Sequence, residues 1–279
     1  MKRKNGAVYY IAVALIILFC LGPIIWCFII SITPDGELMS QGAGILPSTV
    51  TFGNYLDVLN PSSDNHAIIF MGLKNSIKIA TITIAIGVPI TVITGYALSQ
   101  YEFKGKKIYV NLLLLTIVIP VFTTIIPVYN IFRNIGILDS MFWTSVIYIS
   151  AFLPLNTWIM MNYFKQMPKE LWQAAAIDGF NGIQTFFKVI LPLSIPIILT
   201  TTLIMLLMAW KQYIIPIILL SSYDNRTMTM IMSEFMTRNE IKYGIVATAG
   251  IFAIIPPAVI AMIFRKFLIS NMTSGTVKQ

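Results

Sequence analysis

The sequence predicts an all-α membrane protein with six transmembrane helices. Of its 279 residues, 57% are hydrophobic and 11% are charged, against about 25% charged residues in soluble proteins. Six uncharged runs each contain at least 22 residues, and a helix needs about 20 apolar residues to cross the hydrocarbon core of a bilayer. The expected spans are residues 8–32, 77–100, 108–132, 141–164, 187–210 and 244–265.

Residues 1–279 are expected to form a single transmembrane domain, because no low-complexity linker divides the chain. The uncharged run at 38–56 is not counted as a span, since it is rich in Gly, Ser, Thr and Pro and lipid would leave such a backbone unsatisfied. The amino-terminal apolar stretch is longer than the about 7–15 residues of a cleavable signal. We therefore expect it to be retained as the first span.

The distribution of cations predicts the orientation, because Lys and Arg are retained on the cytoplasmic side of a membrane. With both termini in the cytoplasm, the inner segments hold twelve cations and three acidic residues, a net charge of +9. The outer segments hold seven cations and eight acidic residues, a net charge of −1. The sequence thus predicts a multi-pass protein of a bacterial-type plasma membrane with its N-terminus and C-terminus inside.

Several function classes are disfavoured by what the sequence lacks. The overall charge of +8 follows the membrane topology, which argues against nucleic-acid binding. The chain has no G-x-x-x-x-G-K-[ST] phosphate loop, no metal-ligand spacing and almost no ionisable groups inside its spans. Ion-coupled carriers and intramembrane hydrolases keep such groups at membrane depth. Any energy for transport must therefore enter from outside the chain.

A polar, helix-prone segment between two apolar runs, residues 168–196, offers a place for that entry. Pro168 suits the first position of a helix and Glu170 its first turn. Asp178-Gly179 is expected to end this helix, with Gly179 in a left-handed conformation. A second short helix is expected to start at Asn181, with Gln184 in capping-box spacing.

The first helix of this segment combines bulky and small side chains. Leu171 and Trp172 could anchor in the pocket of a soluble partner, while Ala174–Ala176 would allow close approach. Pro192 and Pro196 fall at the inner end of the fifth span, where a bend is expected. An interfacial helix resting on lipid headgroups is the alternative interpretation of the segment.

The segment resembles the EAA loop of binding-protein-dependent ABC importer permeases. That pattern reads EAA, three residues, G, nine residues, I, one residue, LP. Here Gln173 replaces its Glu and Val189 its Ile, so any ion pair expected at the first position loses a charge. The matching residues are Gln173-Ala174-Ala175, Asp178-Gly179, Val189, Leu191 and Pro192.

The resemblance extends along the chain and is closest to carbohydrate-type permeases similar to the second membrane subunit of maltose systems. It implies a MetI-like fold of six spans whose cytoplasmic coupling helix lies within residues 168–192. It also implies transport of a sugar or oligosaccharide by alternating access. Further matching segments are Asn54-Tyr55, Gly95-Tyr96-Ala97-Leu98, Phe103-Lys104-Gly105-Lys106, Ile126-Pro127-Val128-Tyr129 and Thr273–Lys278.

The resemblance further implies the partners: a second homologous permease, two ATPase subunits, an extracytoplasmic solute-binding protein and membrane lipids. ATP with Mg²⁺ would reside at the ATPase subunits, and this chain would bind no cofactor and catalyse no reaction. The residues carried over as the ATPase-coupling element are Glu170, Gln173, Ala174, Ala175, Asp178 and Gly179. Leu171 and Trp172 are added from the packing argument.

Polar and aromatic residues within the spans are candidates for a sugar path, because sugars favour aromatic stacking combined with hydrogen bonding. Each could instead make a helix–helix hydrogen bond or belong to an interfacial belt. The candidates are Tyr129, Asn130, Asn156, Trp158, Trp210 and Gln212.

Two other function classes remain open at this point. An ion-coupled carrier would work alone, without any ATPase, although the charge-poor spans argue against it. A sensory or scaffolding membrane subunit would use the same segment to hold a soluble partner without any transport.

Overall fold

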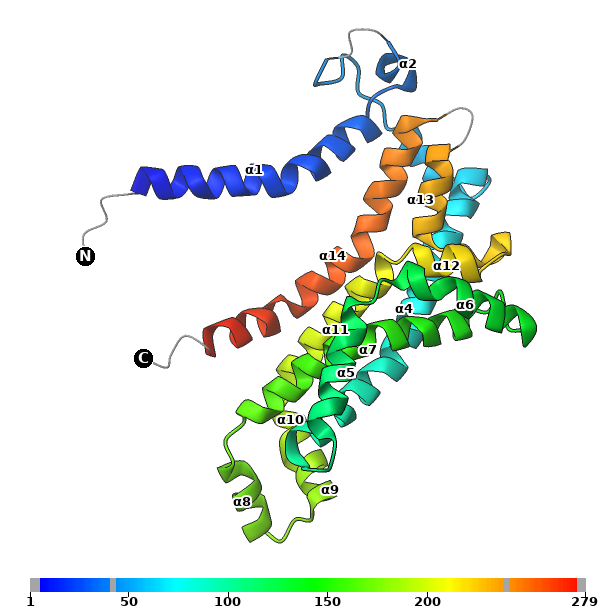
Figure 1. Cartoon of the computed structure of the whole chain (residues 1–279). Helices are drawn as coiled ribbons and strands as arrows, with labels where there is room; N and C mark the ends of the chain where they lie inside the picture. The colour runs from blue at the N-terminus through cyan, green and yellow to red at the C-terminus, as the bar shows by residue number, and fades with distance from the viewer. Residues whose placement is uncertain (1–5, 41–43, 238–240, 275–279) are drawn as a thin grey trace. The chain divides into compact units, whose positions relative to one another are not determined.

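The computed structural model describes residues 6–40, 44–237 and 241–274, and every regular element in these ranges is a helix (Figure 1). The chain divides into two compact units. The first comprises Met1–Leu73 and Met230–Pro256, and the second comprises Lys74–Thr229 and Pro257–Gln279. The unit boundaries fall inside three helices, α4, α13 and α14, so each unit is described by itself.

The first unit contains three helices of its own and parts of three others. Its own helices are α1 (Gly6–Ser31), α2 (Asp35–Leu38) and α3 (Gly53–Leu59). It shares α4 (Asp64–Gln100), α13 (Met228–Thr237) and α14 (Tyr243–Ser274) with the second unit.

The second unit holds the remaining helices. The longer ones are α5 (Lys106–Val118), α6 (Val121–Asn134), α7 (Met141–Gln166) and α11 (Ile195–Trp210). The short elements are α8 (Glu170–Ile177), α9 (Gly182–Thr185), the π-helix η1 (Phe186–Ile190), α10 (Leu191–Leu193), α12 (Ile214–Leu219) and the 3₁₀ turn η2 (Tyr223–Asn225).

Four helices in the described residues are long and apolar enough to cross a membrane by themselves. Two bent helix pairs bring the number to as many as six if each pair is one span. The four single helices are Val8–Ser31, Asp64–Gln100, Met141–Gln166 and Tyr243–Arg265, and the bent pairs are Lys106–Val118 with Val121–Asn134 and Gly182–Leu193 with Ile195–Trp210.

The expected third span, 108–132, is not one continuous helix. α5 and α6 are bent by 95° relative to each other, and the break falls at Ile119 and Pro120. Ile119 has an extended backbone with ψ 119°, as is usual for the residue before a proline. Pro120 also lacks the N–H that would continue the helix. A second bend of 73° at Ser194 lies between Pro192 and Pro196, where the sequence predicts one.

The first unit is held together by hydrogen bonds among its short helices and the ends of the long ones. The Ser31 and Tyr55 hydroxyls lie 2.8 Å apart, and Asn54 Nδ2 donates to the Ser31 carbonyl at 3.1 Å. The Gly244 N–H donates to the Asp35 carboxylate at 3.0 Å. An added Cβ at Gly244 would collide with Asn54. A larger residue at this position would have to displace the Asn54 amide, which donates to Ser31.

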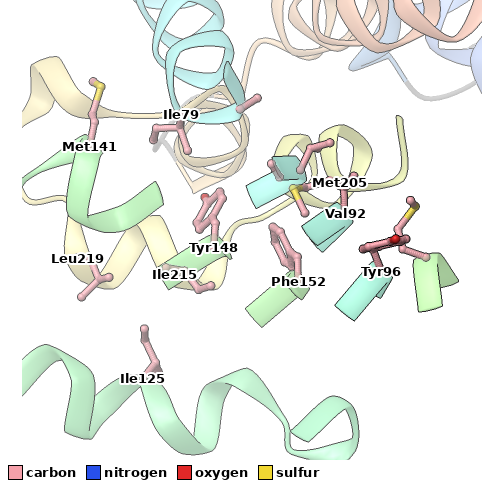
Figure 2. Close-up of a cluster of buried hydrophobic side chains, with 14 of the residues drawn as sticks. Ile79, Val92, Tyr96, Ile125, Met141, Tyr148, Phe152, Met205, Ile215 and Leu219 are labelled. Atoms are coloured by element: carbon pink, nitrogen blue, oxygen red, sulfur yellow. The ribbon is translucent and has the colours of Figure 1, made fainter. Parts of the chain in front are cut away.

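The core of the second unit includes close crossings of α4 with α7 and with α11, and side chains of α6, α12 and η1 complete it. An ideal Cβ built at Gly95 would lie 2.6 Å from Met160 Cβ and 3.0 Å from Met161 N. At Gly87 it would lie 2.8 Å from Met205 Sδ. Such close approach of helices through small residues is common in membrane bundles. Figure 2 shows buried side chains of this core, including Tyr148, Phe152, Val92, Tyr96 and Met205.

A polar junction centred on Asp139 joins the α6–α7 connection to the segment after α12. The Asp139 carboxylate accepts the N–H groups of Ser221 and Ser222, each at 2.9 Å, and also the Ser222 hydroxyl. Its backbone N–H donates to the Leu219 carbonyl at 2.8 Å, and its carbonyl accepts from Asn225 Nδ2 at 2.9 Å. We call this cluster the Asp139 junction.

Asp139 adopts φ +61°, which Asp tolerates better than most residues. Burial raises the pKa of its carboxyl, but the hydrogen bonds from Ser222, Asn225 and Ser221 outweigh that effect and hold the pKa below its usual value. The junction therefore satisfies its own polar groups around an ionised carboxylate.

Candidate functional site

The loop of residues 168–192, called here the EAA loop, begins with a helix as the sequence predicts. The Leu171 N–H donates to the Pro168 carbonyl at 3.2 Å, and the Gln173 N–H donates to the Lys169 carbonyl at 3.2 Å. α8 itself begins at Glu170 with Lys169 as its N-cap. Pro168 therefore lies two residues before the helix, whereas the sequence suggested the first helical position.

The helix ends at Gly179 through paired backbone hydrogen bonds. The Phe180 N–H donates to the Ala175 carbonyl at 2.9 Å, and the Gly179 N–H donates to the Ala176 carbonyl at 3.1 Å. Gly179 has φ +77°, and this combination is the Schellman arrangement. A left-handed conformation strains residues that carry a Cβ. The expected glycine stop is confirmed.

The second short helix starts with the predicted capping box. Asn181 Oδ1 accepts the Gln184 N–H at 2.9 Å, and Gln184 Oε1 accepts the Asn181 N–H at 3.0 Å. α9 then continues into the π-helix η1 and into α10. The glycine stop of α8 and the capping box of α9 thus lie at the two ends of the short connection between these helices.

One face of α8 lies against the bundle of its own unit. Ala175 is buried, and Leu171 and Trp172 are half-buried against the core cluster. The Trp172 Nε1 donates to the Tyr96 hydroxyl at 3.4 Å, and the Tyr96 ring lies 4.6 Å from the Phe186 ring. Trp172 therefore attaches the loop to α4, and Leu171 is partly covered by the core cluster. Their entry into a partner's pocket stays a prediction.

The other face of the loop is exposed and partly apolar. Ile177 is 86% exposed and Ile183 is 72% exposed. The sequence reasoning did not single out these two exposed isoleucines of the loop. The sequence feature that could have indicated them is an apolar residue on each side of the Gly179 turn. α8 has eight residues and α9 has four, and helices this short leave such side chains uncovered. The predicted coupling residues that are exposed with them are Glu170, Gln173, Ala174, Asp178 and Gly179.

The charges of the loop are not used in pairing within the described part of the chain. Neither Glu170 nor Asp178 forms an ion pair there. Lys188 instead lies with its ammonium 5.0 Å from the centre of the Phe180 ring. Gln173 replaces the acidic residue of the EAA pattern at an exposed position. The outward face therefore offers shape and apolar surface more than paired charge.

The structure gives two of the candidate sugar-path residues a local structural role. Asn156 is fully buried and its Nδ2 donates to the Phe152 carbonyl at 2.8 Å within α7. Gln212 Oε1 accepts the N–H groups of Tyr213 and Ile214 at the start of α12.

The other four candidates are distributed among exposed and half-buried positions. Trp158 is 41% exposed and Asn130 is also exposed, whereas Tyr129 and Trp210 are half-buried. Two cavities are described in this structure, one at the end of α4 and one beside α2, and none of the six candidates lines either of them. The structure does not bring the six residues together as one site.

The helical spans and the two-sided loop define a class: a multi-pass α-helical membrane protein with an exposed helix–turn–helix element between two of its helices. Residues 87–274 match a family described as the binding-protein-dependent transport system inner membrane component. The match covers more than half of the chain. The chain belongs to this family.

Curated relatives match the chain over nearly its full length. The trehalose/maltose transport system permease protein MalG of Thermococcus litoralis is 30% identical over 269 residues, covering 96% of this chain and 95% of the relative. The trehalose transport system permease protein SugB of Mycobacterium tuberculosis is 29% identical over 282 residues, covering 100% of each chain.

Solved structures share the fold. A chain of a bacterial ABC transporter involved in the import of the acidic polysaccharide alginate superposes with a TM-score of 0.77 at 23% identity. The alignment covers 95% of this chain and 98% of that chain. The expected all-α permease fold is therefore confirmed.

Family membership settles the general role of the chain. It is a multi-pass permease subunit of a binding-protein-dependent ABC importer, as the EAA resemblance suggested. The family consists of membrane components of transport systems, so the expectation of a transporter subunit rather than an enzyme is confirmed. A lone ion-coupled carrier and a scaffold without transport do not fit this family.

Proposed function

We propose that this permease moves a sugar or oligosaccharide into the cytoplasm by alternating access, driven through its EAA loop by a separate ATPase. The curated relatives named for trehalose and maltose transport support a carbohydrate substrate. The absence of a phosphate loop from the sequence supports an external energy source. Alternating access is a rigid-body rearrangement that a partner's ligand state can bias.

The observation that carries this proposal is the two-sided construction of the loop. Trp172 and Ala175 attach α8 to the bundle, while Ile177 and Ile183 are exposed. If a soluble ATPase buries the two isoleucines, its movement would be transmitted to α8 and, through the contact of Trp172 with Tyr96, to α4. Closure of the ATPase dimer upon ATP would thus rearrange the spans, and hydrolysis would reset them.

The partners follow from the same proposal. Two ATPase subunits hold ATP and Mg²⁺, and this chain binds no cofactor. A second homologous permease covers α1, whose apolar side chains are exposed in this unit, Phe19 at 85% and Leu15 at 61% among them. An extracytoplasmic solute-binding protein, of the kind the family description names, delivers the sugar.

The proposed orientation places both termini and the EAA loop in the cytoplasm. The net charge of +9 on the inner segments supports it. The test is labelling of single cysteines by a membrane-impermeant maleimide in intact cells, after both native cysteines are replaced. Cysteine at Lys104, an exposed residue of a predicted cytoplasmic segment outside the loop, should react only in opened cells, and cysteine at Leu56 should react in intact cells. The opposite pattern would refute the orientation.

The test of coupling uses the assembled transporter with all its subunits. The substitution Ile177→Asp should reduce ATP-dependent uptake of labelled trehalose or maltose by more than about tenfold, because a carboxylate is costly to bury in an apolar contact. Retention of the ATPase during purification should fall in parallel. The matched control is Ile135→Asp, at an isoleucine 61% exposed outside the loop.

Two results would contradict the proposal. Normal uptake by the Ile177→Asp transporter would exclude the loop as the coupling element. Loss of uptake by Ile135→Asp to the same extent would show a general sensitivity to charge rather than a docking contact. The folded amount of each variant in the membrane is measured alongside uptake.

A further inference from the structure

A cavity of about 720 Å³ lies at the end of α4, the start of α5 and the end of α7. It is lined within the second unit by nine residues between Ser99 and Asn111 and by Lys165. The EAA loop contributes no residue to it. The cavity is therefore a feature separate from the proposed coupling surface.

The cavity is lined by three lysines and one carboxylate, which leaves a net charge of +2. Lys106 is engaged: its ammonium donates to Glu102 Oε1 at 2.7 Å and to the Tyr101 carbonyl at 2.9 Å. Lys107 and Lys165 have no ion-pair partner among the described residues and are exposed. Two ammonium groups are therefore available to an anion in the cavity.

The start of α5 adds the positive end of a helix dipole to the lining of the cavity. Gly105, with φ +87°, is the N-cap of α5 and provides no side-chain cap. The first N–H groups of a helix have no partner within the helix and favour a negative charge beside them. Gly105 and the first residues of α5 line the cavity together with the lysines.

An apolar stripe leads away from the cavity along α5. Ile108, Leu112 and Leu115 are 66%, 56% and 58% exposed, and their spacing of four and three residues places them on one helix face. Basic groups at the start of a helix, followed by an exposed apolar stripe, are expected where the helix passes from water into hydrocarbon. The lysines suit a headgroup phosphate and the apolar stripe suits its acyl chains. A soluble anion would have no use for the stripe.

We propose that this cavity binds the headgroup phosphate of an anionic phospholipid, held by Lys107 and Lys165, with its acyl chains along the α5 stripe. Basic pockets at the membrane surface recognise such headgroups by charge and phosphate contacts. Lys106 also lines the cavity, but its ammonium is already paired with Glu102. This site does not depend on the role of the EAA loop.

The test is lipid retention by the purified transporter, measured by native mass spectrometry after titration with phosphatidylglycerol or phosphatidylcholine. The double variant Lys107→Gln with Lys165→Gln should bind phosphatidylglycerol more than about tenfold more weakly, at about fivefold for each lysine. The matched control replaces Lys74 and Lys78, two exposed lysines of α4, with Gln and should retain the lipid. Replacement of Lys107 and Lys165 by Arg should retain it as well.

Four outcomes would overturn the proposal. The first is unchanged phosphatidylglycerol binding by the Gln double variant. The second is equal retention of phosphatidylcholine by the unmodified transporter, which would assign binding to the apolar stripe alone. The third is displacement of the lipid by inorganic phosphate at equal concentration, which would indicate a site for free anions. The fourth is a Gln double variant that loses the ATPase subunits but still binds phosphatidylglycerol, which would show that Lys107 and Lys165 contact a protein subunit.

Discussion

The α4–α7 crossing and the EAA loop both depend on a glycine, and they depend on it for opposite reasons. At Gly95 there is no room, since an added Cβ would lie 2.6 Å from Met160 Cβ. At Gly179 there is open space, with no atom within 4 Å of such a Cβ, but the backbone has φ +77°. Gly95 therefore serves packing, and Gly179 serves the shape of a turn.

This difference separates folding from coupling. The crossing is buried and apolar, so a substitution at Gly95 should affect whether the helix bundle folds. The loop has one attached face and one exposed face. A substitution at Gly179 should therefore affect coupling to transport and leave folding of the bundle largely unchanged. The same residue type thus predicts two different phenotypes, and substitutions at both positions can distinguish them.

The largest expected effect is that of Gly95→Leu. The new side chain would meet Met160 Cβ and the Met161 backbone, and a backbone neighbour cannot move as a flexible side chain would. Most of the folded permease should be lost, as measured by fluorescence-detected size-exclusion chromatography of detergent extracts. Gly179→Leu is the matched control and should give a near-normal peak. Equal peaks would remove the distinction between the two regions.

The second effect is on transport by the loop variant itself. Gly179→Leu forces a side chain into a left-handed conformation at a cost of about 1–2 kcal/mol, so the turn between α8 and α9 should open. ATP-dependent uptake should fall about tenfold or more while the folded amount stays near normal. Gly179→Asn should lose less, because Asn tolerates this conformation better. Equal losses for Leu and Asn would argue against the backbone explanation.

A third, smaller effect concerns a turn that has positive φ without glycine, the Asp139 junction. Asp139→Asn keeps the tolerated φ but removes the charge that accepts the Ser221 and Ser222 N–H groups. The free energy of unfolding should fall by about 1–2 kcal/mol at neutral pH. Thermal unfolding of the detergent-purified chain measures it.

The pH dependence of that difference has a definite sign. The pKa of Asp139 is lowered in the folded protein, so the ionised carboxylate contributes stability above its unfolded-state pKa. This contribution is lost as the pH falls through the lower pKa of the folded state. The unmodified chain and Asp139→Asn should therefore converge in acid. A constant difference down to the most acidic measurable pH would exclude the charge as its cause.

The smallest expected effect is that of Gln173→Glu, which restores the acidic residue of the EAA pattern. Gln173 is exposed, and surface ion pairs contribute at most about 1 kcal/mol. Uptake should stay within about fivefold of the unmodified transporter. A larger change in either direction would mean that charge pairing contributes more to docking than the apolar face of Ile177 and Ile183.

The parts of the loop that could be predicted from sequence are those that local chemistry decides. Gly179 ends a helix because it accepts positive φ, and Asn181 with Gln184 caps the next helix within four residues. Which face of α8 is attached could not be read in this way. The contact between Trp172 and Tyr96 joins residues 76 positions apart, and no local pattern specifies it.

The same distinction applies to the fold. Six apolar runs predict the spans, but the 95° bend of the third depends on how Ile119-Pro120 is accommodated by its surroundings. The Asp139 junction pairs residues more than 80 positions apart. An aspartate before a serine gives no sign of such a partner in sequence. Long-range polar contacts were therefore absent from the sequence-based picture.

The π-helical turn at Phe186–Ile190 has a consequence for how the length of this protein can vary. A π-helical turn accommodates one more residue than an α-helical turn without changing the facing of the helices on either side. A deletion of one residue here would restore an ordinary α-helix and leave α11 facing as before. The same deletion inside α11 would rotate everything beyond it by about 100°. Removal of one residue from Phe186–Lys188 would shorten the nine-residue spacing between Gly179 and Val189, yet the folded bundle should tolerate it better than the same deletion inside α11.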